Sequence, residues 1–352
     1  MSRELPLPPF YDPKNAGRWD YSPDQSGLFV SAAGWRKSQA VKPAAADERK
    51  VNLLLIDVQR DFCFPEGSLY VGGRSGRGAL DDNRRTAEFI YRNLDRLTEI
   101  TATLDTHHPF QIFFPSFWVD AAGEPLQAHR EVSAADVAAG RARPNPDVAR
   151  WLCDRDEAWM GQHALHYCRE LERGGRYRLY LWPPHCIVGS AGYALAGAIH
   201  EARLFHTFVR SAASRTETKG DNPLTENYSV LRPEVQSRHD GKALALPNDS
   251  LLERLLSADA LVVAGQAASH CVKSTVDDLL EAILARNRAL ARRVYLMTDC
   301  MSSVAVPDDK GGFLADFTPQ AEAALQRYAD AGMNLVRSTD PLSSWPGLDS
   351  IT

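Results

Sequence analysis

Six short runs of mainly apolar residues recur along the chain, and polar residues bound each of them. Runs of this kind are typical of strands that are buried on both faces of a parallel sheet. We therefore predict strands at 51–57, 100–105, 204–211, 260–265, 293–299 and 333–338.

Segments with the periodicity of amphipathic helices lie between these runs. The clearest are 83–100, 272–290 and 319–332, and the last ends in Gly332, as expected just past a helix. Alternating strands and helices predict an α/β protein with a doubly wound, mainly parallel six-stranded sheet and helices on both of its faces. In such a sheet, ligands bind beyond the carboxyl ends of the strands.

Two stretches fall outside this alternation. Residues 1–49 combine several prolines with aromatic residues such as Phe10, Trp19 and Trp35. We expect them to form an extended N-terminal arm, whose rings pack on the body of the protein or on a partner subunit. Within the main domain, predicted at 50–345, residues 115–178 are expected to form an insertion that acts as a lid or an oligomer contact.

The composition narrows the functional classes. The 352 residues include 40 Lys and Arg against 45 Asp and Glu, which gives a net charge of −5, and 44% of them are hydrophobic, as in an ordinary globular protein. No basic stripe predicts a nucleic-acid partner, and no apolar stretch is long enough for a membrane span. The N-terminus lacks the apolar core of a secretory signal, so we expect a cytoplasmic protein. The six scattered cysteines form no C-x-x-C pair and are expected to be reduced thiols.

Reactive side chains follow several of the predicted strands. Asp57 ends the first run, Lys219 lies in a polar loop after the third, and Cys271 opens the helix after the fourth. A thiol at a helix N-terminus lies near the positive end of the helix dipole, which favours the nucleophilic thiolate. A cysteine nucleophile also needs a base, and two ionisable groups arrive at the same sheet edge. Each residue alone also fits a structural role, but their joint placement predicts a catalytic site.

A second group of side chains has the chemistry of a metal site. Asp105 and His107 follow the second predicted strand, and His185 lies in the run LYLWPPHCIVGSAGY. Carboxylate and imidazole ligands suit zinc, iron or manganese, and two ligands separated by one residue at a strand end can reach the same ion. The glycine-rich run GGRSGRG at 72–78 lacks the spacing of a phosphate-binding loop.

Five ordered motifs carry a family resemblance, and they span most of the chain from Val51 to Ser338. They are LLIDVQRDFCFPEGSL (54–69), TLDTHH (103–108), LWPPHCIVGSAG (181–192), KGDNPLTENYS (219–229) and AGQAASHCVKSTVDDL (264–279). Together they resemble the isochorismatase-like cysteine hydrolase superfamily, and specifically its nicotinamidase branch. The resemblance implies a catalytic triad of Asp57, Lys219 and Cys271 and a divalent ion (Zn, Fe or Mn) held by Asp105, His107 and His185. It also implies a cis peptide at Gln266–Ala267 and an oxyanion hole formed by the N–H groups of Ala267 and Cys271.

The leading hypothesis is a cysteine amidohydrolase that converts nicotinamide to nicotinic acid and ammonia through a thioester on Cys271. The alternatives are a metal-independent hydrolase of another small amide, of the carbamoyl or ureido type, and a non-catalytic binding protein on the same fold. The resemblance also leads us to expect a homo-oligomer. Two positions depart from the family pattern: Gln111 stands where a further histidine near the metal often falls, and His270 replaces a tyrosine often seen before the nucleophile.

Overall fold

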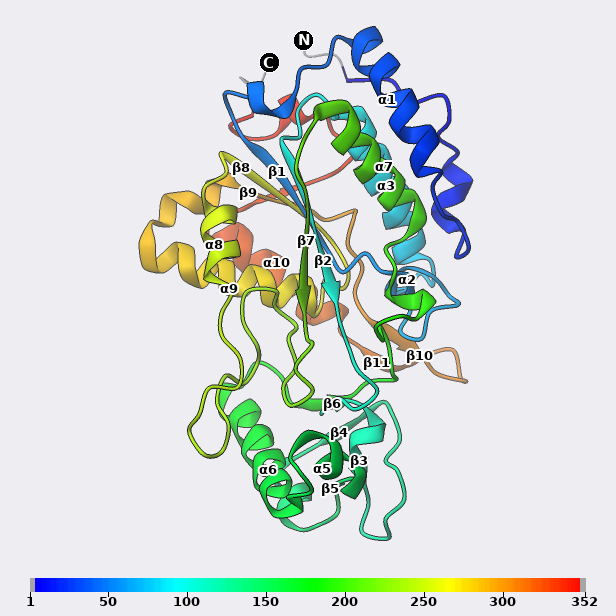
Figure 1. The fold of residues 1–352 in the computed structure, drawn as a ribbon. Helices are drawn as coiled ribbons and strands as arrows, with labels where there is room; N and C mark the ends of the chain where they lie inside the picture. Colours follow the sequence, from blue (N-terminus) through cyan, green and yellow to red (C-terminus); the bar gives the residue numbers. More distant parts are fainter. Residues whose placement is uncertain (1–3, 349–352) are drawn as a thin grey trace.

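The computed structural model describes residues 4–348, and its centre is a six-stranded parallel sheet (Figure 1). The strands are β1 (Val51–Ile56), β2 (Glu99–Asp105), β7 (Ser214–Lys219), β8 (Ala260–Gly265), β9 (Val294–Met297) and β12 (Asn334–Val336). They lie in the order β12-β9-β8-β1-β2-β7, and all neighbouring strands pair in parallel. The predicted fold class is confirmed.

Helices cover both faces of this sheet (Figure 1). One face packs against α3 (Gly78–Arg92) and α7 (Gly197–Arg210), and the other packs against α8 (Asp249–Leu256), α9 (Cys271–Arg286) and α10 (Thr318–Asp330). Successive residues of a strand point to opposite faces, so Leu53 and Leu55 belong to the first core, whereas Leu54 and Ile56 belong to the second. This explains why the sequence of β1 is almost continuously apolar.

One of the six predicted strands is wrong. Residues 204–210 form the last turns of α7, in which Ala198, Ala202, Phe205 and Val209 are buried at helical spacing, and Ser211 caps its end. The sixth strand is instead β7, whose sequence SRTETK is polar because it lies at an edge of the sheet and most of its side chains are exposed. Lys219 is therefore the last residue of a strand and not part of a loop beyond one.

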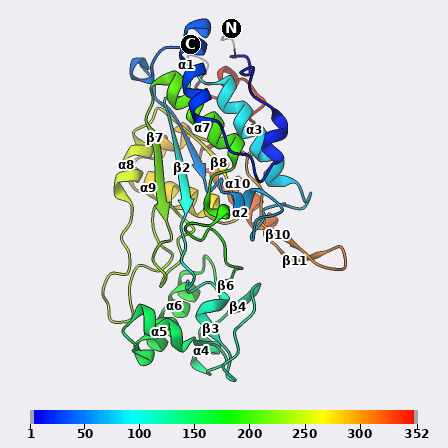
Figure 2. The same cartoon turned by 45° about the vertical axis from the view of Figure 1, so that its right-hand side comes forward.

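The N-terminal segment is not simply an extended arm. Residues 25–39 form the helix α1 (Gln25–Gln39), which begins after Asp24, whose side chain accepts a hydrogen bond from the N–H of Gly27. Leu28 and Ala32 of α1 are buried, and the ring of Phe10 packs edge-on against Phe205 at a centroid distance of 4.9 Å. The segment therefore packs on the chain's own body, over α7 and α3 (Figure 2), while residues 1–3 lie outside the described part.

Residues 115–178 fold into a small unit of their own beyond the carboxyl ends of β2 and β7 (Figure 2). Its elements are β3 (Trp118–Val119), β4 (Arg130–Val132), α4 (Ala134–Ala138), β5 (Arg143–Pro144), α5 (Pro146–Leu152) and α6 (Glu157–Gly174). β3 pairs with β5, and β4 pairs with β6 (Leu179–Leu181), both antiparallel. A third core that includes Trp118, Met160 and Tyr167 stabilises the unit and continues into the main domain at Phe62 and Leu69. Its function as a lid or an oligomer contact remains a prediction.

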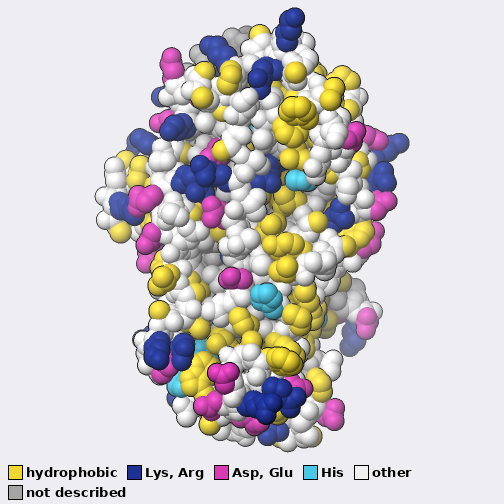
Figure 3. Space-filling view, in the orientation of Figure 1, with side chains coloured by type: hydrophobic (Ala, Val, Ile, Leu, Met, Phe, Trp, Pro, Cys, Tyr) yellow, Lys and Arg dark blue, Asp and Glu magenta, His cyan; other side chains and the backbone are white. Residues whose placement is uncertain are grey.

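The remaining elements are short. α2 (Arg60–Cys63) follows β1, and the hairpin of β10 (Ala305–Pro307) and β11 (Phe313–Asp316) projects from the side of the molecule (Figure 2). Single 3-10 turns begin at Pro13, Ala44, Pro115, Ala191, Arg288 and Leu342. On the face drawn in Figure 3, basic and acidic side chains are interspersed, as expected from the nearly balanced charge.

Candidate active site

The predicted reactive side chains meet at the carboxyl edge of the sheet. Asp57 directly follows β1, Asp105 ends β2, Lys219 ends β7, and Cys271 is the first residue of α9. Asp105 and Lys219 are register partners in neighbouring strands. All four residues are buried, with exposed fractions of 0 to 6%. The fold thus brings together residues that are more than 200 positions apart in the sequence.

Lys219 is the central cation of this group. Its Nζ lies 2.9 Å from Asp57 Oδ2 and 2.8 Å from Asp105 Oδ1, and it donates to the Asn227 carbonyl at 2.8 Å. The same Nζ lies 3.6 Å from Cys271 Sγ. One ammonium group therefore contacts both carboxylates and the thiol.

Burial and these contacts together determine the charges of the group. Burial disfavours the charged ammonium of Lys219, but Asp105 and Asp57 outweigh it and raise its pKa well above the usual range. Burial raises the pKa of Asp57 in spite of its lysine partner. Burial also opposes ionisation of Asp105, but His107 and Lys219 hold the pKa of that carboxyl well below its usual value. Asp57 is therefore the carboxylate that is readier to take up a proton.

The position of Cys271 at the start of α9 does not make it a thiolate at rest. Burial raises the pKa of its thiol well above the ordinary value, and Asp57 and Asp105 act in the same direction, while Lys219 opposes them. The thiolate favoured by the helix dipole is therefore not the resting state, because burial and the two carboxylates dominate. A buried neutral thiol needs a base next to it, and a carboxylate oxygen of Asp57 lies within 4.8 Å of the sulfur.

Thr103 fixes the Asp57 side chain, a contact that sequence reasoning missed. Asp57 has a left-handed backbone, with φ of 46°, and its N–H donates to Thr103 Oγ1 at 2.9 Å. The Thr103 hydroxyl in turn donates to Asp57 Oδ1. Thr103 lies two residues before Asp105 on β2, within the TLDTHH run. The run therefore serves both groups of the site.

The turn between β8 and α9 places backbone donors beside the thiol. The peptide bond between Gln266 and Ala267 is cis, as the resemblance implied. Among the described residues, the N–H groups of Ala267 and Cys271 donate to no partner, and both residues line the same pocket. Two unpaired N–H groups next to a nucleophile are what an oxyanion hole requires.

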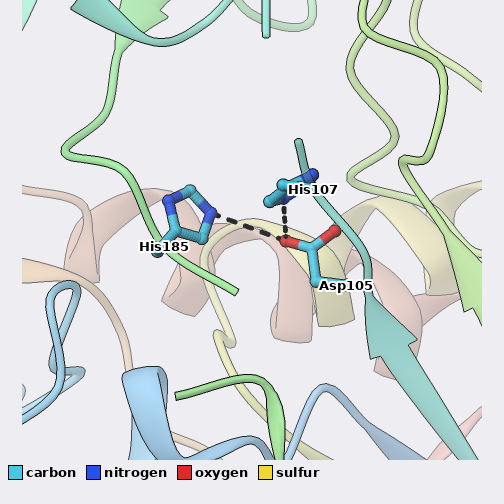
Figure 4. Close-up of side chains that lie close together, drawn as sticks. All are labelled: Asp105, His107 and His185. Atoms are coloured by element: carbon cyan, nitrogen blue, oxygen red, sulfur yellow. Dashed lines mark ion pairs between the residues drawn. The ribbon is translucent and has the colours of Figure 1, made fainter. Parts of the chain in front are cut away.

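The three predicted metal ligands converge on one point. One ligand atom each of Asp105, His107 and His185 lies within 4.8 Å of the others, and all three residues are buried. Asp105 Oδ2 lies 2.9 Å from His107 Nε2 and 3.6 Å from His185 Nε2, and Figure 4 shows both rings directed at this carboxylate. Burial lowers the pKa of His107, so its imidazole is the neutral form that binds metals.

The hydrogen bonds of His185 show that a cation fits this point. His185 Nδ1 lies 2.8 Å from the Pro183 carbonyl, which can only accept, so Nδ1 carries the proton. In the neutral imidazole, Nε2 then has a lone pair that faces an oxygen of Asp105, so that two acceptors face each other. A divalent ion between them resolves this arrangement, and carboxylate with imidazole suits zinc, iron or manganese.

Gln111 lies behind His107 and not beside the carboxylate. Its Nε2 lies 3.0 Å from His107 Nδ1 and donates to the Gly220 carbonyl at 2.7 Å. His107 Nδ1 also lies 3.2 Å from the same carbonyl. Gln111 therefore holds the ring of a ligand and is not placed as a ligand itself, while the neighbouring His108 is exposed.

A small, largely apolar pocket leads to the thiol. Its walls include the side chains of Phe62, Leu69, Val71, Trp182, Tyr228 and Val304, next to Asp105, His107 and Cys271. Glu226 and His270 also line it, and sequence reasoning gave no role to Glu226. The only sequence signal for Glu226 was its place in the run that follows Lys219. An apolar slot with few polar groups suits a small planar molecule.

His270 is a neutral wall of this pocket. Burial lowers its pKa to about 3. Its ring stacks on Tyr177 at a centroid distance of 5.5 Å and meets Trp182 edge-on at 5.2 Å. The position that departs from the family pattern is thus occupied by an aromatic ring without charge.

Between residues 4 and 348, no helix combines the length and the apolar character needed to cross a bilayer. This finding concerns only the helices that the structure describes.

Comparisons with known proteins establish the family of the chain. No family model matches the chain. A nicotinamidase of Escherichia coli (strain K12) is 30% identical over 282 residues, which are 79% of this chain and 95% of that protein. Among solved structures, a nicotinamidase/pyrazinamidase of Acinetobacter baumanii has a TM-score of 0.48 and 18% identity, with 84% of this chain and 99% of that one covered.

Two further solved structures are similar in the same way. The yeast nicotinamidase has a TM-score of 0.48 and 17% identity, with 81% of this chain and 99% of that one covered. A pyrazinamidase of Pyrococcus horikoshii, solved in complex with zinc, has a TM-score of 0.43 and 17% identity over 82% of this chain and 99% of its own. Because the chain shares 30% identity with a curated nicotinamidase over nearly the whole of that protein, it belongs to the nicotinamidase family of amide hydrolases.

Proposed function

We propose that this hydrolase converts nicotinamide to nicotinic acid and ammonia, with Cys271 as the nucleophile. The observation that carries the proposal is the convergence of Asp57, Lys219 and Cys271 with the cluster of Asp105, His107 and His185 beside one pocket, which Asp105, His107 and Cys271 line. The curated relative supports nicotinamide as the substrate, because it is a nicotinamidase. The apolar walls of the pocket suit a flat heteroaromatic ring.

In the first half of the reaction, Asp57 takes the proton from the Cys271 thiol. The sulfur attacks the carboxamide carbon, a C–S bond forms, and the carbonyl electron pair moves to the oxygen. The N–H groups of Ala267 and Cys271 hold this negative oxygen. When the pair returns, the C–N bond breaks, and the nitrogen leaves as ammonia with the proton carried by Asp57.

In the second half, Asp57 takes a proton from a water molecule, and the water oxygen attacks the thioester carbon. The C–S bond then breaks, nicotinic acid forms, and the sulfur recovers the proton from Asp57. The raised pKa of Asp57 supports this role because it makes the carboxylate a stronger base, first toward the thiol and then toward water. Lys219 keeps the carboxylate in place, 2.9 Å away.

Asp105, His107 and His185 are the residues that would hold a divalent ion. When bound, the ion supplies a Lewis-acid contact that orients the ring nitrogen of the substrate. His185 is prepared for this by its bond to the Pro183 carbonyl, and His107 is prepared by the Gly220 carbonyl, which lies 3.2 Å from its Nδ1 and can accept a proton there.

The proposal is tested by ammonia release from nicotinamide, measured for the wild type, for Cys271→Ala and for a chelator-treated sample. Cys300→Ala is the matched control, because Cys300 is also a buried cysteine but does not line the pocket. We expect release by the wild type and the control, none by Cys271→Ala, and a loss on chelation that added zinc or manganese reverses.

Each other outcome has a definite meaning. If the wild type releases no more ammonia than Cys271→Ala, the nicotinamidase proposal fails, and other small amides become the substrates to test. If release depends on Cys271 but resists chelation, the metal part of the proposal fails, and a metal-independent amidase remains.

A further inference from the structure

The backbone around Ala267 is held on every side except one. The N–H groups of Gln266 and Ala268 donate to backbone carbonyls at 2.8 Å each. The Ala267 carbonyl accepts from the N–H groups of His270 and Val272, at 3.0 and 3.1 Å. The N–H of Ala267 has no described partner and belongs to a residue that lines the pocket. The neighbouring bonds therefore determine where this N–H points.

The side chain of Gln266 adds a second layer of contacts. It is 1% exposed, its Nε2 donates to Asp82 Oδ2 at 2.9 Å, and its Oε1 accepts from the Ser302 N–H at 3.2 Å. Both ends of the amide are thus bonded, so the side chain has one orientation. The carbonyl of Ser302 is also the acceptor for Ala268, so Ser302 contacts the residues on both sides of Ala267.

Asp82, on α3, holds this arrangement together from outside the pocket. It is 3% exposed, and its Oδ2 accepts from the Ser302 hydroxyl at 2.6 Å as well as from Gln266. Its Oδ1 accepts from Arg85 Nη2 at 2.8 Å. Charged acceptors make the stronger hydrogen bonds, and one carboxylate here fixes both residues that flank the Ala267 peptide from behind.

The glycine-rich run at 72–78 allows this approach. A Cβ atom on Gly78 would lie 2.3 Å from Ser302 Oγ, so only glycine lets the start of α3 pack against Ser302. The N–H of Gly78 also donates to the Gly72 carbonyl at 2.7 Å, which closes the loop. The glycine-rich run, which lacks the spacing of a phosphate-binding loop, thus has a packing role beside the turn between β8 and α9.

We propose that Asp82 is a positioning residue for amide hydrolysis, which acts through Gln266 and Ser302 to hold the Ala267 N–H where negative charge develops on the carbonyl oxygen. This inference rests on the proposed function. Asp82 does not line the pocket, so it contacts no substrate and its effect must pass through the peptide. A donor held in advance stabilises the transition state more than the bound substrate, so its loss lowers kcat more than it raises KM.

The test compares Asp82→Ala, Asp82→Asn and Ser302→Ala with the control Asp81→Ala. Asp81 is the adjacent acid on α3, and it forms a surface pair with Arg77. Asp82→Asn keeps an oxygen that can accept from both Gln266 and Ser302. Ser302→Ala removes only one hydroxyl, so this variant is expected to disturb folding least.

Two ligands of similar shape distinguish a misplaced Ala267 N–H from a general loss of order in the pocket. Pyridine-3-carboxaldehyde reacts with Cys271: a C–S bond forms, the carbonyl π bond breaks, its electron pair moves to the oxygen, and the thiol proton passes to Asp57. This adduct places a negative oxygen at the Ala267 N–H. Nicotinate fills the same pocket without a tetrahedral carbon, so it measures the pocket alone.

For Asp82→Ala we expect kcat for nicotinamide to fall about 10-fold to 100-fold, and the aldehyde affinity to fall by a similar factor. KM and the nicotinate dissociation constant should stay within about threefold of the wild type, because the pocket walls are unchanged. Asp82→Asn should recover most of kcat, Ser302→Ala should lie between, and Asp81→Ala should match the wild type.

The inference is overturned if Asp82→Ala keeps full kcat, or if nicotinate binding falls together with kcat and aldehyde affinity. Failure of the proposed function is a different result, namely no ammonia from the wild type. In that case a crystal structure of Ser302→Ala or Asp82→Ala decides the matter: a displaced Ala267 peptide supports the positioning role, and an unmoved one refutes it.

Discussion

Asp105 and Lys219 are register partners at the ends of β2 and β7, and their side chains meet with Nζ 2.8 Å from Oδ1. The pair joins the two parts of the site, because Asp105 also faces both histidines and Lys219 also contacts Asp57 and the Cys271 thiol. A change at either residue therefore affects the surroundings of the Cys271 thiol and the cluster of Asp105, His107 and His185 together.

Lys219→Met should abolish this link. It leaves two carboxylates buried without their cation, which we expect to lower the free energy of unfolding by about 3–5 kcal/mol. Ammonia release should fall roughly 1,000-fold or more. Urea denaturation and steady-state kinetics measure the two effects. Lys310→Met, at an exposed lysine, is the control and should change neither; a stable and active Lys219→Met protein would contradict the assignment.

Gln111→Ala should weaken metal binding without removing a ligand. The variant loses the amide that holds the Gly220 carbonyl at 2.7 Å. Because this carbonyl lies 3.2 Å from His107 Nδ1 and can hold the proton there, we expect zinc affinity to fall about 10-fold to 100-fold. Competition with a chromophoric chelator measures the dissociation constant directly. Gln236→Ala, at an exposed glutamine, should leave it unchanged, whereas a loss as large as that of His107→Ala would make Gln111 a ligand itself.

Asp47→Ala tests whether the N-terminal segment is an integral part of the fold. Asp47 pairs with Arg210 of α7, whose side chain is 1% exposed. Without its partner the guanidinium remains buried and uncompensated, and we expect a loss of about 3–5 kcal/mol in unfolding free energy. Asp20→Ala removes an exposed pair with Arg18 and should cost less than about 1 kcal/mol. Equal losses of unfolding free energy for the two substitutions would show that the buried pair stabilises the fold no more than the exposed one.

His206 should make the fold sensitive to acid. Burial lowers its pKa to about 4 in the folded state, whereas the unfolded chain has the ordinary value near 6.5. Between these values the unfolded state binds more protons, so stability falls as the pH falls from about 6.5 to 4, by at most about 3 kcal/mol for this residue. His206→Gln should flatten the slope of unfolding free energy against pH, and His108→Gln, at an exposed histidine, should not. If the unfolding free energy of His206→Gln depends on pH as steeply as that of the wild type, His206 is not the group responsible.

The sequence predicts most of the sheet because the four central strands are largely buried on both faces and mainly apolar, and the short edge strand β12 retains two apolar residues, Leu335 and Val336. It misses β7 because an edge strand need not be apolar, and it places a strand on Phe205 and Val209 because their residue types suit strands, although their spacing suits a helix. Helix α1 is missed because its buried face is small, with Leu28 and Ala32 as its buried residues.

At the site, the sequence predicts which side chains gather but not their protonation. Whether Cys271 is a thiolate depends on burial and on two nearby carboxylates, and no local pattern around the residue contains this information. The contacts of Thr103 with Asp57 and of Gln111 with His107 depend on distances across strands and loops. A single sequence gives residue types, whereas these roles follow from which side chains the fold makes neighbours.

The side chains of the site come from five separate segments: Asp57, the Asp105–His107 pair, His185, Lys219 and Cys271. No fragment of the chain that lacks the edge strand β7 holds the lysine that contacts both carboxylates. Ammonia release is therefore an assay for the completed sheet. During refolding from denaturant, its recovery should coincide with or follow the docking of β7, and it should lag behind optical signals of early helix formation.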